Sequence, residues 1–511
     1  MNRFTLVLIS YCFLSGISGE CAVHAEEQLN SLPAFPGAQG FGSTTPGGRG
    51  GRVIKVTNLN TSGPGSLQAA CSAEGPRIVV FDTSGVIPGD VVIDQNRITI
   101  AGQSAPGAGI TIQGRLMTPY SREARFSDIV VRFLRIRPDP STGASGDGIQ
   151  FGRVSNCVID HVSCAWGNDE VIDVYNANKL AIQWCTIEES DTEGHNKGIH
   201  NFGLINGPDG GRFSLHHTLF AHNRRRNPAV AHGPSDIRNI VVYDFRDGLS
   251  HEGHPPNNLG FNLIGNYYKP GPSSPDIFPF CFVDTISYYL RDNYIEGVGI
   301  IQDPWAEADK LYGLRYYAQK GRRAVKETTV PHVTTFTPQE AYELVLDQAG
   351  CFPRDAITNR TIEEVRNGEG EWGRHEPNGL MTGLSTWSPL KDTDADGMPD
   401  CWEEANGLDP TDGGDYTRVM ESSYTAIEEY LNILARRLIE TKGIMSEPGD
   451  VNADGKVGFS DLFPLVWAVI SGTYSWASDI NVDSRMSMGD LGAWWDICSP
   501  DDDGQAAGQS E

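Results

Sequence analysis

The chain has 511 residues, which is enough for one large domain with small appendages and too long for a single ordinary domain. Hydrophobic residues make up 39% and charged residues 21%, as in a folded globular protein. The formal net charge of −26 argues against nucleic acid as a partner, because phosphate binding requires a basic face. A polyanionic ligand would need a local basic patch or bound cations.

The first 25 residues have the pattern of a secretory signal peptide. Arg3 supplies the positive charge, residues 6–17 form a short apolar run, and small residues precede a cleavage point after Ala25. The run is too short for a convincing membrane anchor. The sequence therefore predicts a secreted protein, extracellular or periplasmic and in some cases surface-attached, without a transmembrane helix.

Between about residues 50 and 300, short strands rich in Val, Ile and Leu recur, separated by Gly, Asn and Asp turns. The irregular step of roughly 20 to 35 residues is typical of a solenoid. Amphipathic helices are missing between the strands, which counts against βαβ units and leaves a β-sandwich as the alternative. We predict an all-β fold, a right-handed parallel β-helix over residues 33–335. The predicted strands are 97–102, 128–136, 156–164, 179–187, 213–220, 237–245, 259–267 and 286–295.

Asparagines near several of these strands are expected to tolerate the left-handed backbone of tight turns. Ordinary turn positions explain them equally well. They are Asn156, Asn178, Asn239, Asn258 and Asn266.

The character of the chain changes after residue 335. Residues 336–385 are predicted to extend the β-helix domain, with helices at 337–347 and 362–366. Residues 388–440 combine an acidic loop with an amphipathic helix at 424–438, and a further small module spans 447–498. The acidic tail 499–511 is predicted to be disordered.

A series of motifs then becomes recognisable in the order of a known family. These are AFPGAQGFGSTTPGGRGG at 34–51, GDGIQF at 146–151, VIDHVSCAWGNDEVIDV at 158–174, HNKGIH at 195–200 and FSLHHTLFAHNRRRNP at 213–228. Over roughly residues 33–440 the chain resembles bacterial pectate lyases. The resemblance implies a carbon–oxygen lyase that uses Ca²⁺ to cleave polygalacturonate (pectate) by β-elimination, leaving 4,5-unsaturated oligogalacturonides.

Three carboxylates lie in or beside successive β segments: Asp147, Asp169 and Asp173. Calcium takes six to eight oxygen ligands, several of them carboxylates, although such acids also decorate solvated turns. The resemblance implies that these three hold the catalytic calcium. One departure is Ser145, which stands where the family often places a further aspartate.

The concentrated positive charge is Lys197 together with the run 224–226. The resemblance implies that Arg226 is the base, that Lys197 is catalytic and binds a substrate carboxylate, and that Arg225 and His200 contact the substrate. Nearby cations would lower the arginine pKa, because like charges disfavour the protonated form, so an alkaline optimum is expected. Ala229 and Ala231 stand near the place of a second family arginine, a role that Arg246 could take.

The acidic loop after residue 388 alternates carboxylates before a glycine, with Asp392, Asp394, Asp396 and Asp400 as candidate calcium ligands. It resembles the loops of thrombospondin type 3 repeats, and an acidic linker is the alternative reading. We expect such a loop to act as a rigid joint.

The module 447–498 holds two loops with acids and asparagines at positions 1, 3, 5 and 12 of a calcium loop. It resembles a small α-helical dockerin, which implies a cohesin or cell-surface partner. Trp467, Trp494 and Trp495 are expected in the core of the module. The candidate ligands are Asp450, Asn452, Asp454 and Asp461 in the first loop, and Asp479, Asn481, Asp483 and Asp490 in the second.

Three other functions remain compatible with the sequence. A polygalacturonase-type hydrolase would use paired carboxylates, and a pectin lyase would act on esterified chains without the calcium cluster. A non-catalytic β-helix that binds glycan through calcium belongs to a different class. The products separate these possibilities, because only a lyase leaves an unsaturated sugar end.

Overall fold

The computed structural model describes residues 32–120, 125–139, 146–193, 195–208, 210–250, 259–274, 276–283, 286–301, 321–444, 447–452 and 456–498. The predictions for the signal peptide, for Asn258, for Ser145 and Asp454, and for the tail 499–511 lie outside these residues.

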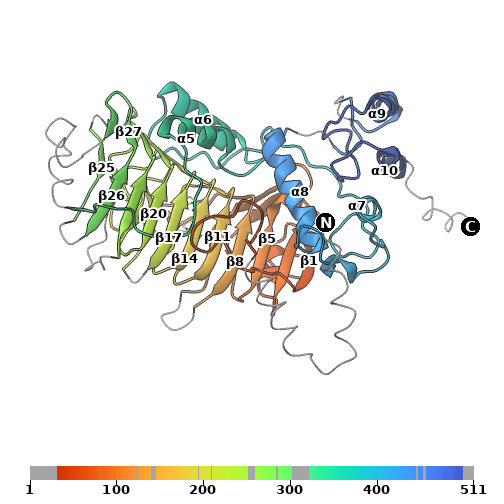
Figure 1. Cartoon of the computed structure of the whole chain (residues 1–511), viewed down its shortest axis with the longest axis horizontal. Coiled ribbons are helices and arrows are strands. Elements are labelled where there is room, and N and C mark those ends of the chain that lie inside the picture. Colours follow the sequence, from red (N-terminus) through yellow and green to blue (C-terminus); the bar gives the residue numbers. More distant parts are fainter. Residues whose placement is uncertain are drawn as a thin grey trace, which may run out of the picture.

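Three long sheets wind around a common core and form a parallel β-helix (Figure 1). Most consecutive strands enter different sheets and pair in parallel with their counterparts in the next coil, whereas the last two strands of the 10-stranded sheet form an antiparallel pair. Sheet 1 has 11 strands, sheet 2 has 10 and sheet 3 has 6. The predicted β-helix is therefore confirmed, and its right-handed turn stays an expectation from the usual chirality of parallel crossovers.

Sheet 1 contains β1 (Arg52–Val56), β2 (Arg77–Phe81), β5 (Ile98–Ala101), β8 (Ser127–Arg132), β11 (Ser155–Asp160), β14 (Asn178–Gln183), β17 (Gly211–His216), β20 (Ser235–Arg238), β23 (Phe261–Ile264), β26 (Ser287–Arg291) and β29 (Arg322–Arg323). Sheet 2 contains β3 (Gly85–Pro88), β6 (Ile110–Gln113), β9 (Leu134–Ile136), β12 (Ser163–Ala165), β15 (Thr186–Glu188), β18 (Leu219–Ala221), β21 (Val241–Tyr243), β24 (Tyr267–Lys269), β27 (Asn293–Ile295) and β28 (Gly299–Ile301). Sheet 3 contains β4 (Val91–Val92), β7 (Leu116–Met117), β10 (Ile149–Gln150), β13 (Glu170–Asp173), β16 (Phe202–Asn206) and β19 (Ala229–Val230), and β22 (Asp247–Leu249) pairs with β25 (Phe278–Phe280).

Most predicted strands are in fact two strands that meet at a corner between sheets 1 and 2. A single residue with positive φ makes the corner, as at Phe133 (53°), His161 (51°) and Trp184 (51°). Such a conformation costs a non-glycine residue roughly 1–2 kcal/mol. Stacking between neighbouring coils compensates, since the rings of Phe133 and His161 lie 4.8 Å apart and those of Trp184 and His217 lie 4.4 Å apart.

The helices that follow the β-helix are α5 (Pro338–Gln348), α6 (Ala356–Asn367), α7 (Asp400–Ala405), α8 (Ala426–Thr441), α9 (Phe459–Ser471) and α10 (Met488–Cys498), and α2 (Leu67–Cys71) lies earlier in the chain. Among them, α5, α6 and α8 pack back onto the β-helix. Helices α5 and α6 bury Val345 and Val365 against sheet 2, and α8 buries Ile427 against Val80 of sheet 1 (Figure 1). The predicted helices at 337–347 and 424–438 are confirmed, and that at 362–366 is longer than predicted.

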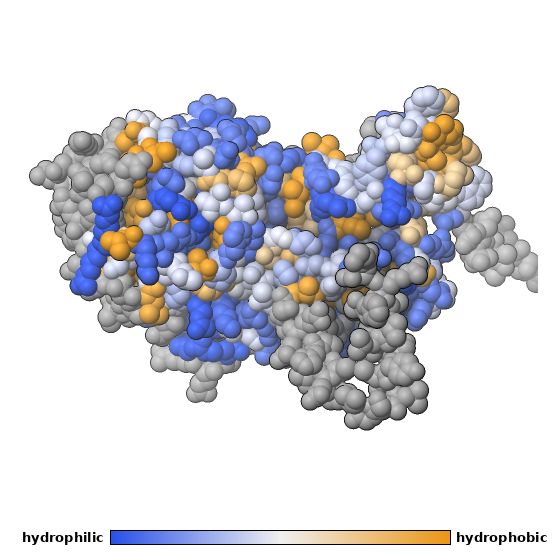
Figure 2. Space-filling model, in the orientation of Figure 1, coloured by the Kyte–Doolittle hydropathy of each residue, from blue (hydrophilic) through white to orange (hydrophobic). Residues whose placement is uncertain are grey.

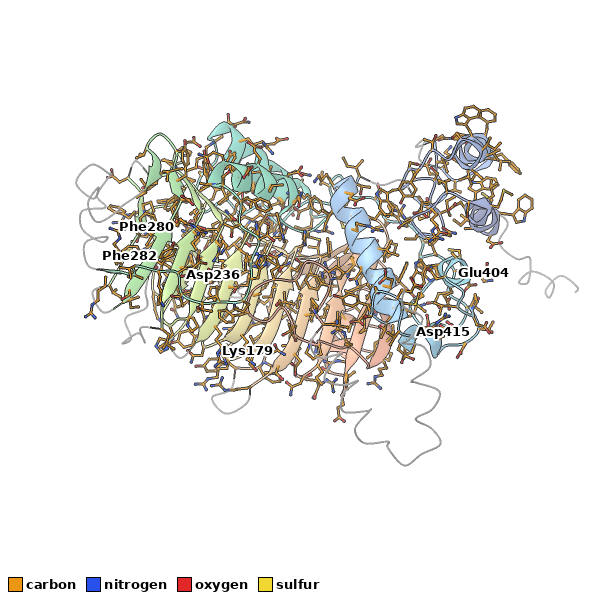
Figure 3. All side chains as sticks on the ribbon, viewed as in Figure 1. Lys179, Asp236, Phe280, Phe282, Glu404 and Asp415 are labelled. Atoms are coloured by element: carbon orange, nitrogen blue, oxygen red, sulfur yellow. The ribbon has the colours of Figure 1, made fainter. Side chains whose placement is uncertain are left out.

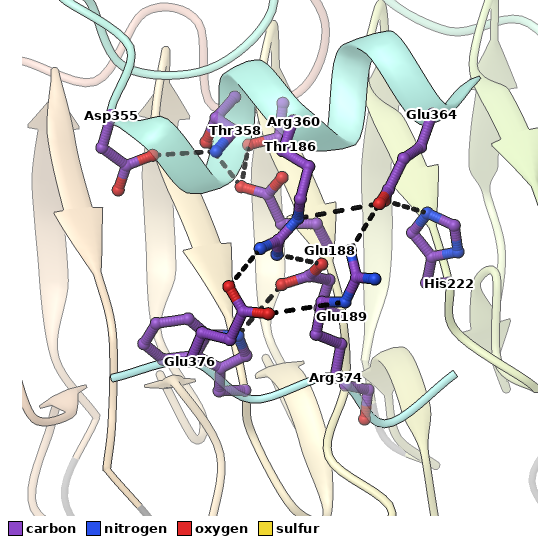
Figure 4. A network of polar contacts seen from close by, with 12 residues as sticks. Thr186, Glu188, Glu189, His222, Asp355, Thr358, Arg360, Glu364, Arg374 and Glu376 are labelled. Carbon is purple, nitrogen blue, oxygen red and sulfur yellow. Dashed lines mark hydrogen bonds and ion pairs between the residues drawn. The ribbon is translucent and has the colours of Figure 1, made fainter. Parts of the chain in front are cut away.

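A buried polar network fixes α6 to sheet 2 (Figure 4). Arg137 is fully buried and pairs with Asp355 at 3.0 Å and Glu188 at 3.2 Å. Arg360 of α6 reaches Glu189, which follows β15, at 2.5 Å. Because each buried charge has an opposite partner, the network holds the helix without leaving an isolated charge in the core.

His222 is buried in the same network, and its charge makes stability depend on pH. Burial opposes this charge, but a hydrogen bond to Asp244 at 2.9 Å and the Glu364 carboxylate 3.2 Å away raise the pKa of His222 to about 9. An unfolded histidine titrates near pH 6.5. The stabilisation, on the order of 3 kcal/mol, is therefore complete below about pH 6.5 and is lost as the pH rises through 9.

We expect His222→Gln to flatten this alkaline loss, measured as the free energy of unfolding in denaturant at pH 6 and pH 10. His332→Gln, at an exposed histidine, is the control. An equal decline with pH in the His222 variant and the wild type would contradict the assignment.

The module 447–498 is built from α9 and α10, and its apolar residues divide between core and surface. Trp494 is buried as predicted, whereas Trp467 is 62% exposed and Trp495 56% exposed. The prediction of a core position for the last two is therefore wrong. Phe459, Phe463, Trp467 and Ile470 all lie exposed on α9 (Figure 2).

None of the described helices is long and apolar enough to span a bilayer.

Candidate functional site

Successive coils bring the predicted site residues together along sheet 3. Asp147 lies just before β10 and Asp169 just before β13, and these two strands pair with Ile149 opposite Ile172. The next strands, β16 and β19, follow Lys197 and Arg226. Residues up to 79 positions apart in sequence therefore come from four neighbouring coils, because each coil stacks directly on the previous one.

Three carboxylates meet at the edge of β10 and β13. Ligand oxygens of Asp147, Asp169 and Glu170 all lie within 4.8 Å of one another, and Asp147 accepts a hydrogen bond from the Glu170 amide at 2.9 Å. Asp147 and Glu170 are almost fully buried. Burial, with the charge of Asp173, raises the pKa of Asp147 to about 8. An oxygen-only group of buried, mutually repelling carboxylates fits a hard divalent cation such as calcium.

Asp173 lies beside this group without joining it. Its carboxylate accepts a hydrogen bond from the Tyr175 amide at 2.6 Å, and burial together with the charge of Glu170 raises its pKa to about 8. The structure thus adds Glu170 to the predicted carboxylates, and the calcium-binding role of Asp173 stays a prediction. Glu170 was missed because its contact with Arg226 depends on the stacking of coils and not on local spacing.

Arg226 contacts this cluster directly. Its guanidinium forms an ion pair with Glu170 and lies over the Phe202 ring, 4.1 Å from the ring centre. Burial raises the pKa of Glu170 well above its ordinary value, against the opposing charge of Arg226. The Arg226 guanidinium is therefore engaged with a carboxylate of the cluster in this arrangement.

Two histidines flank Lys197 and face Asp169. Nε2 of His195 lies 3.4 Å and Nε2 of His200 lies 3.6 Å from the Asp169 carboxylate. His200 Nδ1 lies 2.9 Å from the Gly198 carbonyl oxygen, which orients the ring. Lys197 is exposed at the tip of this loop. His195 and His200 therefore lie next to the carboxylate cluster, with Lys197 in the loop between them, and the substrate-binding roles of Lys197 and His200 stay predictions.

Arg225 lies on the other side of the same edge. Its Nε donates to Asp247 at 2.5 Å, and Arg246 approaches the same carboxylate at 3.8 Å. Both guanidinium groups are partly exposed. Ala229 and Ala231 are buried and offer no charge, whereas Arg246 shares the Asp247 carboxylate with Arg225.

The candidate calcium loops behind the β-helix behave differently from one another. Ligand oxygens of Asp392, Asp394 and Asp396 lie within 4.8 Å of one another. Asp400 does not join them, because its carboxylate accepts from the Thr393 amide at 2.7 Å and the Thr393 hydroxyl at 2.6 Å.

The dockerin-like loops gather no comparable group among the described residues. Loop amides donate to their carboxylates instead. The Asn452 and Gly458 amides donate to Asp461, and the Ile480 and Ser487 amides donate to Asp490.

A parallel β-helix with buried carboxylates and an arginine on successive coils has the build of a polysaccharide-degrading enzyme. Two curated relatives agree with this class. Probable pectate lyase C of Aspergillus fumigatus (strain Af293) is 34% identical over 424 residues, covering 80% of this chain and 95% of the relative. That of Aspergillus terreus is 34% identical over 427 residues, with the same coverage. The chain belongs to the pectate lyase family and is a polysaccharide lyase.

No protein-family model matches the chain. Among solved structures, a thermostable pectate lyase shares 14% identity at a TM-score of 0.46, covering 62% of this chain and 97% of that one. A Bacillus pectate lyase in complex with trigalacturonate shares 15% identity at a TM-score of 0.44, covering 61% and 98%. The family assignment rests on the sequence relatives, which are fungal, whereas the motifs resembled bacterial members.

Proposed function

We propose that the chain cleaves polygalacturonate by calcium-dependent β-elimination and releases 4,5-unsaturated oligogalacturonides after secretion. The observation that carries this proposal is the meeting of Asp147, Asp169 and Glu170, from two adjacent coils, with Arg226 from a third. The cluster supplies ligands for a cation, and the arginine supplies a group that can receive a proton.

Each residue has a role in this scheme. Asp147, Asp169 and Asp173 hold calcium, and Glu170 joins them. Calcium, when bound, would withdraw charge from a substrate carboxylate and acidify the neighbouring C5 hydrogen. Outside these ligands, Lys197, Arg225 and His200 contact the substrate.

Arg226 removes the C5 proton only after its pair with Glu170 is weakened. A free guanidinium has a pKa above 12, so it accepts a proton readily only at alkaline pH or beside other cations. A cation that competes for the Glu170 oxygens would weaken the ion pair with Arg226, and the like charge of Arg225 would disfavour a second positive charge beside it. We therefore expect an alkaline optimum for the reaction.

The test is ultraviolet absorbance of unsaturated products from polygalacturonate, with calcium and with chelator. We expect absorbance to rise only with calcium, and Arg226→Ala to reduce the rate at least about 100-fold, as for loss of a general base. Arg212→Ala is a matched control, because Arg212 is an exposed arginine on sheet 1 that also has a positive φ, 49° against 60° at Arg226.

Each other outcome selects another function. New reducing ends without absorbance identify a hydrolase, and turnover of esterified pectin without calcium identifies a pectin lyase. Binding of polygalacturonate without turnover identifies a non-catalytic glycan-binding protein.

We also propose that the segments after the β-helix bind calcium and that the dockerin-like module, residues 447–498, attaches the enzyme to a cohesin or a cell-surface partner. Support comes from the exposed stripe Phe459, Phe463, Trp467 and Ile470, whose spacing places it on one face of α9. In the scheme, the first loop offers Asp450, Asn452, Asp454 and Asp461, and the second offers Asp479, Asn481, Asp483 and Asp490.

A further inference from the structure

A second acidic cluster lies behind the β-helix, apart from the lyase site on sheet 3. Asp396 belongs to two groups whose ligand oxygens lie within 4.8 Å of one another, one with Asp392 and Asp394 and the other with Glu403 and Asp415. The first three residues come from the loop before α7, Glu403 from α7 itself, and Asp415 from the short 3-10 turn Asp415–Thr417 (Figure 3).

Some carboxylate oxygens of this cluster accept hydrogen bonds, and the others accept none. One oxygen of Asp392, Asp394 and Asp396 accepts hydrogen bonds from loop amides, and one oxygen of Asp415 accepts from the Asp409 amide. The other oxygen of each of these four aspartates is buried and has no hydrogen-bond partner.

Glu403 makes the cluster more than a group of surface acids. Its side chain is 0% exposed, and neither of its carboxylate oxygens has a hydrogen-bond partner. Leaving a buried carboxylate unpaired is costly, because nothing replaces its lost hydration. Its two oxygens and the four from the aspartates make six buried acceptors, which equals the lower limit of calcium coordination.

We propose that Asp392, Asp394, Asp396, Glu403 and Asp415 form a calcium site that clamps the segment 388–440 onto the β-helix. The spacing agrees with this ligand set. Counting Asp392 as position 1, the carboxylates stand at positions 1, 3, 5 and 12, and Gly397 at position 6 has φ 97°. Position 12 is the usual place of a bidentate glutamate, so Glu403 replaces Asp400 as the ligand expected from the sequence.

The clamp acts through contacts on both sides of the site. Lys55 of β1 donates to Asp392 at 2.7 Å and also pairs with Asp82 at 2.9 Å, which ties the loop to the first coils. Met398 and Trp402, inside and just after the loop, are buried with α8 against Val80 of sheet 1. An ion that fixes the loop therefore also fixes this apolar contact. The six acceptors are all oxygens, and an all-protein set of this size suits calcium better than magnesium.

The experiment measures bound calcium per chain and calcium-dependent thermal stability in the full-length protein. We expect Glu403→Gln to bind about one calcium ion fewer than wild type and to lose most of the rise in unfolding midpoint on adding calcium. Glu404→Gln is the matched control, because Glu404 is the next residue of α7 and is exposed (Figure 3). The dockerin-like loops are intact in both variants, so any calcium bound there contributes equally to both stoichiometries and does not affect their difference.

Asp415→Asn provides a second, milder variant in case Glu403→Gln fails to fold, and it should weaken calcium binding in the same direction. Limited proteolysis should cut between residues 388 and 440 faster in chelator than in calcium. Unchanged stoichiometry and an unchanged calcium effect in both variants would overturn the proposal. Asp147→Asn changes the lyase site and leaves the five clamp residues intact. Failure of the lyase proposal would therefore appear in product formation, and failure of the clamp proposal in the calcium stoichiometry and thermal stability of Glu403→Gln.

Discussion

Asp147→Asn is expected to raise the calcium concentration needed for half-maximal product formation by about 100-fold. The side chain is buried, its carboxylate lies within 4.8 Å of those of Asp169 and Glu170, and the number of charged ligands sets the affinity of a calcium site. The amide keeps the size of the side chain and can still accept the hydrogen bond from the Glu170 amide, so loss of charge is the main change.

The measurement is the initial rate of ultraviolet absorbance against free calcium, with saturating polygalacturonate. Asp347→Asn serves as the control. Asp347 lies on α5, away from sheet 3, where it is half-exposed and pairs with Lys442. If the calcium dependence of Asp147→Asn matches that of the control, the catalytic ion is held elsewhere. The group of Asp169, His195 and His200 would then be the next place to look.

The fold was predictable because each coil of a β-helix repeats a short apolar strand followed by turn residues, and this repeat is visible in the sequence. The predicted segments fall on real strands, but a run such as 156–164 contains β11, a corner at His161 and β12. Hydrophobic patterning does not reveal the corner, because residues on both sides of it point into the same core. Asn239 does make such a corner and Asn156 also has a positive φ, whereas most corners use aromatic residues that stack between coils.

The sites were predictable where ligands alternate along one loop and not where the fold assembles them. Asp392, Asp394 and Asp396 show their spacing directly, whereas Asp415 joins them only because the chain turns back. Glu170 was overlooked for a similar reason, since its contact with Arg226 spans 56 positions and depends on the stacking of β13 under β16 and β19. Local spacing thus identifies the loop site, whereas the carboxylate cluster on sheet 3 depends on the register of the coils.

Arg137→Ala is expected to lower the free energy of unfolding by about 3–5 kcal/mol. The guanidinium is fully buried and donates to Asp355, Glu188 and Thr358, so its removal leaves two buried carboxylates without their main counter-charge. Asp355 also caps α6 by accepting from the Thr358 amide at 2.9 Å. The loss should therefore loosen α6 from sheet 2 as well as destabilise the core.

Denaturant unfolding followed by circular dichroism measures this loss, and Arg115→Ala provides the comparison. Arg115 pairs with Asp90 at 2.5 Å but is 24% exposed, so its removal should cost about 0–1 kcal/mol. Similar losses in the two variants would mean that water reaches the Arg137 network, in which case burial would not explain how α6 is held. A large difference would show that α6 depends on the fully buried ion pairs, because Arg137 is closed to solvent and pairs with two carboxylates, whereas Arg115 is partly exposed and pairs with Asp90.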